Sequence, residues 1–404
     1  MLKTILKPYV HKVRLLNFSR NLHVDGSLGI DSHKSLIIPA AAPGGLGDDA
    51  MVKASISAIH SLNPRKDISV LVPTNFPDSF SFNNEVDYEK KLNAWRHPQK
   101  EVAMMGQYEN VYFLGADILD GALNLPDSVK RIKMAGLFRE QGQNSRIIGF
   151  SLNKSPLPEV IREFNNLKDV PLFLRDPVSY QRAKSLIKGD VVLSADVAFL
   201  LEPKLSEVSE IVEKFTFKEK QRGNITIGIN VHSMLANFSK EGTMEKLLKS
   251  IANLIETTPG CSFVFIPHDY RDISDDRVPL TVIENLLSDR AKKRILNLTK
   301  PMRADEIKKV CSYLDGVLTA RMHIAIASLG MGVPVLGIVY QGKFEGTFSH
   351  FGFEKGFTFE PEEAANEDIL KKRFDEWLLR LDMHKISVIE RLPFVKELAL
   401  KNFE

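Results

Sequence analysis

The chain has 404 residues, of which 44% are hydrophobic and 26% are charged. These proportions are those of an ordinary globular protein, and they exclude a disordered, collagen-like or disulfide-stapled chain. The 54 Lys and Arg residues nearly balance the 51 Asp and Glu residues, so the overall charge predicts no nucleic-acid partner and any anion site must be local. The two cysteines, Cys261 and Cys311, lie in apolar stretches, and we expect two reduced thiols rather than a disulfide.

Residues 1–34 form a short basic arm, whose first acidic residue is Asp25. Lysines and arginines interrupt its apolar residues, so the arm is typical neither of a secretory signal nor of a membrane span. It fits an amphipathic helix on an anionic membrane surface, or a helix packed on the protein body, and Pro8 weakens both helices. The expected location is the cytoplasm, either in solution or at the inner face of the membrane.

Residues 35–206 alternate short apolar runs with helical patterns. Strands are expected at residues 35–40, 68–72, 111–114, 146–150, 171–174 and 191–193. Continuous apolar runs separated by helices indicate parallel strands that are buried on both faces. The polar stretch 75–107 is predicted to be an insertion or a mobile loop.

The charged segment 207–222 interrupts this alternation, which resumes over residues 224–404. Strands are expected at residues 225–230, 262–267, 295–298, 316–319 and 334–339, and the residues from 367 onward have a helical pattern. We therefore predict an α/β fold with two Rossmann-like domains facing a central cleft, as in GT-B glycosyltransferases, and a helical C-terminal tail. Ligands of such folds bind at the carboxyl ends of the strands.

The loop after the first strand reads Pro43-Gly-Gly-Leu-Gly-Asp-Asp49. Its glycines, Gly45 and Gly47 among them, would let backbone amides approach a ligand at the start of the next helix. The loop matches neither a Walker motif nor a complete dinucleotide fingerprint. An alternative is a tight turn in which Asp48 or Asp49 caps the helix.

Arg175 directly follows a predicted buried strand, within Leu174-Arg-Asp-Pro-Val-Ser179. A guanidinium at a strand's carboxyl end is suited to a bidentate grip on a carboxylate or phosphate. The alternative is a structural ion pair with Asp176 or Asp196.

Three cationic or titratable residues follow two neighbouring strands of the second domain: Arg321 and His323 after one, and Lys343 after the next. Their convergence at one sheet edge predicts a functional site, in which a histidine can act as a general acid near neutral pH. His232 and His268 also follow predicted strands and are second-tier candidates. No Cys, His or acidic cluster has the spacing of a metal site.

Together these motifs resemble the polysaccharide pyruvyl transferase family. The resemblance covers residues 36–355 and is carried by the following segments: Gly45-x-Gly47-Asp48, Leu174-Arg-Asp-x-x-Ser179, Ser194-Ala-Asp-Val-Ala-Phe199, Arg321-Met-His323, Gly332-Val-Pro334 and Tyr340-x-x-Lys343. It implies transfer of a pyruvyl group from phosphoenolpyruvate to a sugar of a glycan or a lipid-linked precursor. The product would be a cyclic ketal, and phosphate would leave.

The resemblance and the residue chemistry together give each candidate a role. His323, Arg321 and Arg175 are the predicted catalytic residues, and Arg175, Arg321, Lys343 and His232 are predicted to bind the donor. Gly45, Gly47, Asp48 and Asp49 are predicted to contact the acceptor. The scheme needs no metal and no cofactor beyond the donor substrate, since arginine and lysine can neutralise the phosphate. Two alternatives are a nucleotide-sugar glycosyltransferase on the same fold and a non-catalytic sugar-binding protein.

Overall fold

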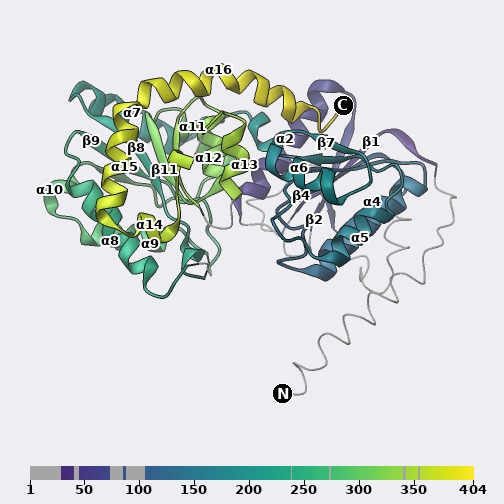
Figure 1. The fold of residues 1–404 in the computed structure, drawn as a ribbon. Coiled ribbons are helices and arrows are strands. Elements are labelled where there is room, and N and C mark those ends of the chain that lie inside the picture. Colours follow the sequence, from purple (N-terminus) through teal and green to yellow (C-terminus); the bar gives the residue numbers. More distant parts are fainter. Residues whose placement is uncertain are drawn as a thin grey trace. The chain divides into compact units, whose positions relative to one another are not determined.

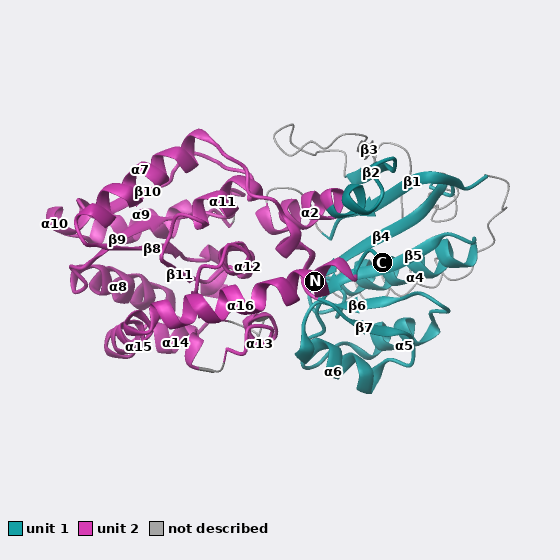
Figure 2. Ribbon diagram, turned by 90° about the horizontal axis from the view of Figure 1, so that it is seen from above, with its two compact units in different colours: residues 1–42, 58–194, 402–404 teal, residues 43–57, 195–401 magenta. Residues whose placement is uncertain are grey.

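A computed structural model describes residues 29–40, 45–72, 85–87, 105–237, 239–272, 274–339, 343–353 and 355–404. Most of the predicted basic arm and most of the predicted insertion at 75–107 lie outside these residues. The chain divides into two compact units (Figure 2). Unit 1 comprises Met1–Ala42, Ala58–Ser194 and Asn402–Glu404, and unit 2 comprises Pro43–Ser57 and Ala195–Lys401.

The described strands of unit 1 form one parallel seven-stranded sheet in the order β3-β2-β1-β4-β5-β6-β7. Their bounds are β1 Asp31–Ile38, β2 Asp67–Val72, β3 Glu85–Asp87, β4 Tyr108–Ala116, β5 Asn144–Phe150, β6 Leu172–Leu174 and β7 Val191–Leu193. Most residues of the central strands are buried on both faces, which is the pattern expected of parallel strands flanked by helices.

The helices of unit 1 begin at residues that suit a helix start. They are α4 Leu125–Glu140, α5 Pro158–Asn166 and α6 Pro177–Leu186. Asn124 caps α4 and Asp176 caps α6, and each helix has a proline in its first turn, where a missing N–H costs no hydrogen bond. Figure 1 shows α4 and α5 side by side; their apolar residues form one core with β4, β5 and β6.

Unit 2 contains a second parallel sheet of six described strands in the order β10-β9-β8-β11-β12-β13. The strands are β8 Ile225–Asn230, β9 Cys261–Phe265, β10 Ile295–Asn297, β11 Gly316–Thr319, β12 Val335–Ile338 and β13 Thr358–Phe359. Because β8, β9 and β11 are adjacent, the residues that follow them meet at one sheet edge.

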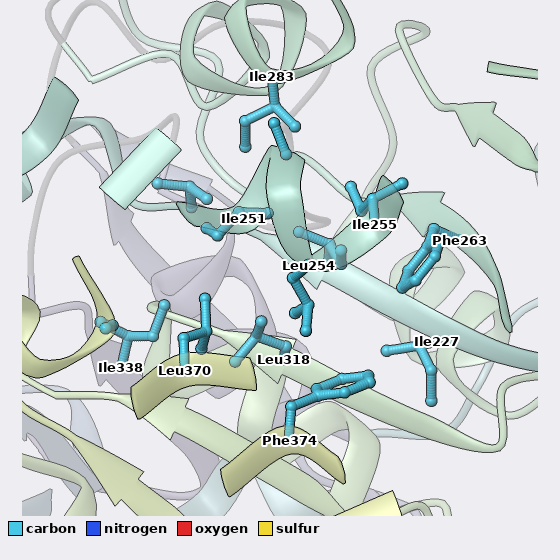
Figure 3. Close-up of a cluster of buried hydrophobic side chains, with 14 of the residues drawn as sticks. Ile227, Ile251, Leu254, Ile255, Phe263, Ile283, Leu318, Ile338, Leu370 and Phe374 are labelled. Atoms are coloured by element: carbon cyan, nitrogen blue, oxygen red, sulfur yellow. The ribbon is translucent and has the colours of Figure 1, made fainter. Parts of the chain in front are cut away.

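The helices and 3-10 turns of unit 2 cover this second sheet. They are η2 Val197–Leu200, α7 Glu207–Gln221, η3 Ser233–Asn237, α8 Thr243–Glu256, α9 Arg277–Leu286, α10 Asp289–Lys292, α11 Ala304–Cys311, α12 Met322–Leu329, α13 Lys343–Ser349, η4 Lys355–Phe357, α14 Pro361–Ala364, α15 Glu367–Leu379 and α16 Leu381–Leu400. Figure 3 shows Leu254 of α8 and Phe374 of α15 directed at Ile227 and Leu318 of the strands. These contacts form the main core of unit 2.

Two short segments each belong to a different unit from the residues next to them in the chain. Helix α2, Leu46–Leu62, starts in unit 2 and ends in unit 1. Asn402 belongs to unit 1, where its Oδ1 accepts hydrogen bonds from Gly149 N at 3.1 Å and Ser194 Oγ at 3.3 Å. Each unit is therefore built from segments at both ends of the chain.

The predicted fold class is confirmed: the structure is α/β, with two parallel sheets and two C-terminal helices, α15 and α16. The charged segment 207–222, which interrupts the predicted alternation, folds as α7; Ser206 and Ser209 form a reciprocal cap at its start, and its Val208 and Val212 are buried. No helix among the described residues is long and apolar enough to cross a membrane.

Candidate active site

The carboxyl ends of β8, β9 and β11 bring three histidines of unit 2 into one cluster. His232 follows β8, His268 follows β9, and His323 lies in the first turn of α12 directly after β11. The rings of His268 and His323 are parallel, with centroids 6.5 Å apart, and His232 is close enough to act on His268 electrostatically. The predicted sheet edge is therefore occupied by titratable side chains.

Asp276 joins the ends of these strands. Its fully buried carboxylate accepts hydrogen bonds from Asn230 Nδ2 at 3.0 Å and from the backbone N–H of His268 at 3.1 Å. Arg321 donates to it through Nε at 3.0 Å and Nη2 at 2.7 Å. Burial raises the pKa of Asp276, and the Arg321 guanidinium opposes that rise. Such a carboxylate fixes its neighbours because any displacement would leave a buried charge uncompensated.

The arginines of the cluster are paired with aspartates. Arg321 Nη1 lies 3.2 Å from Asp269 Oδ2, and Arg271 donates to Asp269 through Nε at 2.9 Å and Nη2 at 2.5 Å. Burial alone would raise the pKa of Asp269, but the two arginines lower it. Two guanidiniums thus face the two carboxylates of Asp269 and Asp276, so these four side chains carry little net charge together.

His323 is held closely by the backbone of α2. A Cβ atom at Gly47 would stand 2.3 Å from its Nδ1 atom, a distance at which atoms overlap. On the opposite nitrogen, Nε2 lies 3.8 Å from Oδ2 of Asp196. The imidazole is therefore fixed between the first turn of α2 and the carboxylate that precedes η2.

The two other histidines differ in their hydrogen-bonding roles. Burial holds the pKa of His268 well below its usual range, and the charges of His323 and Arg321 lower it further. His268 is therefore a neutral imidazole near pH 7. The backbone N–H of Met234 donates to Nδ1 of His232 at 3.0 Å, so the proton of a neutral His232 ring lies on Nε2.

The glycine-rich loop lies against the same sheet edge of unit 2. Gly45 forms an antiparallel bridge with Asp269, and Arg271 is near both Gly45 and Asp48. Asp49 is buried and accepts hydrogen bonds from Arg303 and from Ala304 N, at the start of α11. These contacts fasten the start of α2 to unit 2.

Arg175 belongs to unit 1, where it follows β6. Its side chain is almost fully buried and its Nε donates to Ser151 Oγ at 2.5 Å. Its neighbour Asp176 caps α6 through Ser179 N at 2.7 Å. Lys343 is the first residue of α13, and its side chain lies outside the described part of the structure.

The sequence analysis missed Asp276 and treated Asp196 only as a motif residue and a pairing partner for Arg175. One signal for this cluster was available: His268, Asp269 and Arg271 come immediately after a predicted strand. Asp276 has no comparable signal, because its role depends on a loop that returns to the strand ends. In the parts of the chain that the structure describes, no group of three His, Cys, Asp or Glu residues has the arrangement of a metal site.

Solved structures show which fold this is. A Listeria monocytogenes protein assigned as UDP-N-acetylglucosamine 2-epimerase aligns with a TM-score of 0.60 and 15% identity over 92% of this chain and 94% of its own. S. aureus MnaA with UDP aligns with a TM-score of 0.58 and 16% identity over 90% and 94%. Medicago truncatula UGT71G1 with UDP-glucose aligns with a TM-score of 0.55 and 10% identity over 92% and 96%. At these identities the matches establish a GT-B-like α/β fold and nothing about the ligand.

The family is defined by sequence. The model of the polysaccharide pyruvyl transferase family matches residues 46–342, which include the loop at Gly47 and the cluster at His323. The chain belongs to this family and is a transferase enzyme. A search of curated protein sequences finds no significant match.

Proposed function

We propose that the protein transfers the pyruvyl group of phosphoenolpyruvate to two hydroxyls of one sugar in a glycan or a lipid-linked precursor. Both hydroxyl oxygens bond to the central carbon of the donor, and the bond from that carbon to the phosphate oxygen breaks. The two hydroxyls lose two protons in total. The methylene carbon of the donor gains one proton and becomes a methyl group, and the departing phosphate takes up the other. The observation that carries this proposal is the family match over residues 46–342.

His323 is the proposed proton donor to the methylene carbon. Its imidazole is held between Gly47 and Asp196, and fixed geometry is what general acid catalysis requires. His268 is a poor candidate for the same role, since burial keeps its ring neutral. His232 and His268 remain able to hydrogen-bond a bound anion through neutral rings.

Donor binding is proposed for Arg175, Arg321, Lys343 and His232. Phosphoenolpyruvate carries a carboxylate and a phosphate, whose burial requires compensating charge. Arg321 is already paired with Asp269 and Asp276, so we propose that it mainly orders the strand ends around the donor. Arg175 and Lys343 then supply the positive charge, and replacing either by alanine should raise KM for the donor, by the loss of a charge-assisted hydrogen bond worth about 1.5–3 kcal/mol.

Acceptor contacts are proposed for the loop that contains Gly45, Gly47, Asp48 and Asp49. Asp48 is the candidate for orienting or deprotonating a sugar hydroxyl. It lies at the start of α2, directly after Gly47, and Gly47 contacts the ring of His323. The contacts of Asp49 with Arg303 and Ala304 N support a role in holding the loop rather than in touching the sugar.

A direct assay tests the function. Purified protein is incubated with phosphoenolpyruvate and a panel of glycosides, some of them lipid-linked, and the products are analysed by mass and for released phosphate. We expect a ketal adduct and phosphate in equal amounts. Phosphoenolpyruvate should also raise the melting temperature, because a ligand that binds only the folded state stabilises it. Stabilisation by UDP in place of phosphoenolpyruvate, with no ketal, would support a nucleotide-sugar glycosyltransferase instead.

A further inference from the structure

Asp196 is a buried carboxylate that is fixed in two directions. Its Oδ1 accepts a hydrogen bond from Ala198 N at 2.9 Å and caps η2. Its Oδ2 lies 3.8 Å from His323 Nε2, and only 1% of the side chain is exposed. The amine of the buried Lys308 donates to Phe199 O at 3.0 Å, which holds η2 in place. Asp196 therefore faces His323 from a rigid element.

Apart from Asp196, one feature of the surroundings of His323 disfavours its protonated form. The ring is at the N-terminus of α12, where the helix dipole is positive, and Arg321 precedes that helix. The neutral ring of His268 lies parallel to it, with Asp269 and Arg271 beyond and His232 nearby. Asp48 lies at the start of α2 close to Arg271. The Arg321 guanidinium is paired with Asp269 and Asp276, so the carboxylate of Asp196 mainly offsets the helix dipole.

We infer that Asp196 is a positioning residue for His323: it orients the imidazole and stabilises the imidazolium that would donate the proton. This inference rests on the proposed function of His323. Asp196 touches neither donor nor acceptor in this scheme and acts only through the ring. This positioning role requires the negative charge of Asp196. The hydrogen bond by which Asp196 caps η2 is not sufficient for it.

The test separates charge from structure with Asp196→Asn. Asparagine keeps an oxygen that can accept from Ala198 N but removes the charge. We expect kcat to fall about tenfold at pH 8 and to recover toward pH 6, since losing one opposite charge at this distance shifts a titration by about one pH unit. KM for phosphoenolpyruvate should change less than twofold. The matched control is Asp315→Asn, whose carboxylate accepts from Thr226 N at 2.8 Å at the other end of β8; its pH profile should equal that of the wild type.

A second readout does not depend on turnover. In protein with ¹³C,¹⁵N-labelled histidine, the His323 resonances, assigned by their loss in His323→Gln, should titrate about one pH unit lower in Asp196→Asn than in the wild type. The positioning role would be overturned if His323 titrated at the same pH in Asp196→Asn as in the wild type, or if Asp196→Asn lowered kcat by the same factor at every pH. A wild-type protein that makes no ketal would contradict the proposed function while the titration still decides the pairing. If Asp196→Asn fails to fold, Asp196→Ser keeps a capping oxygen and is measured in the same way.

Discussion

Gly47 and His323 are in direct contact, and the contact leaves no room for a side chain. A Cβ atom at position 47 would lie 2.3 Å from Nδ1 and 2.7 Å from Cε1 of the imidazole. Glycine is therefore required here by close approach, not by an unusual backbone angle. The glycine-rich loop and the histidine motif, far apart in sequence, are parts of one packed arrangement.

Gly47→Ala should displace His323 and reduce kcat. We expect a loss of about 100-fold, because a small misplacement of a reacting group has effects of this size, with a fall in stability of about 1–3 kcal/mol from overpacking. Steady-state kinetics and urea unfolding measure the two effects. Gly260→Ala is the control, since a Cβ there meets no atom within 4 Å. Full activity in Gly47→Ala would show that the ring can move without loss.

His323→Gln should lower kcat by about 10²–10⁴-fold, the usual contribution of a positioned acid or base. Glutamine preserves size and hydrogen bonding but cannot donate a catalytic proton, so KM for phosphoenolpyruvate should change little. His60→Gln, at an exposed position of α2, controls for the substitution itself. Near-normal kcat in His323→Gln would mean that the proton comes from another group.

Asp276→Asn should destabilise unit 2 strongly. It leaves Arg321 without its closest carboxylate, and breaking a buried ion pair costs about 3–5 kcal/mol. The neighbouring Asp275 pairs with the more exposed Arg277, so Asp275→Asn should cost no more than about 1 kcal/mol. Chemical denaturation of both variants gives the comparison. Equal losses would contradict the role of Asp276 in joining β8, β9 and β11.

Lys308 should make stability depend on pH. Burial, aided by the charge of Lys396, lowers the pKa of Lys308 to about 7, whereas an unfolded lysine titrates near pH 10.4. Between about pH 7 and pH 10 the unfolded chain therefore binds more protons, so the free energy of unfolding rises with pH, by up to about 1.4 kcal/mol per pH unit from this group. Below about pH 7 the folded state is protonated too, and the slope from Lys308 disappears.

The measurement is denaturant unfolding at several pH values between 7.5 and 9.5. Lys130, whose pKa burial also lowers to about 7, contributes in the same direction, so the comparison of variants isolates Lys308. Lys308→Met should flatten the slope relative to the wild type, and Lys292→Met, at an exposed position of α10, should leave it unchanged. An unchanged slope in Lys308→Met would show that the buried amine keeps an ordinary pKa.

The sequence predicts the sheets of this protein well because their strands are nearly continuous apolar runs. Every described strand except β3 and β13 overlaps a predicted apolar run, and the C-terminal helices α15 and α16 match the predicted helical pattern from residue 367 onward. The sequence also predicts that Arg321, His323 and Lys343 converge at one sheet edge, since residues after adjacent parallel strands meet there, and it places His232 after another strand of the same domain. These predictions need only local composition and chain order.

The pairing partners within the site could not be predicted in the same way. Asp276 reaches Arg321 and Asn230 through a loop whose path depends on tertiary packing. The ion pairs of Arg321 with Asp269 and Asp276 likewise do not follow from its position at a strand end. The contact of Gly47 with His323 likewise depends on α2 beginning in unit 2, although β1 immediately before it belongs to unit 1.

The placement of Asn402 has a consequence for how the protein is made. On the ribosome, β1 to β7 emerge well before Asn402, yet the backbone N–H of Gly149 in β5 donates to the side-chain oxygen of Asn402. The start of α2 likewise emerges early, whereas Arg303 and Ala304, which donate to its Asp49, emerge late. Most multidomain chains can complete the N-terminal domain during translation. In this protein unit 1 lacks a part until Asn402 has been synthesised, so a fragment that ends at residue 194 would lack the hydrogen bond to Gly149 N.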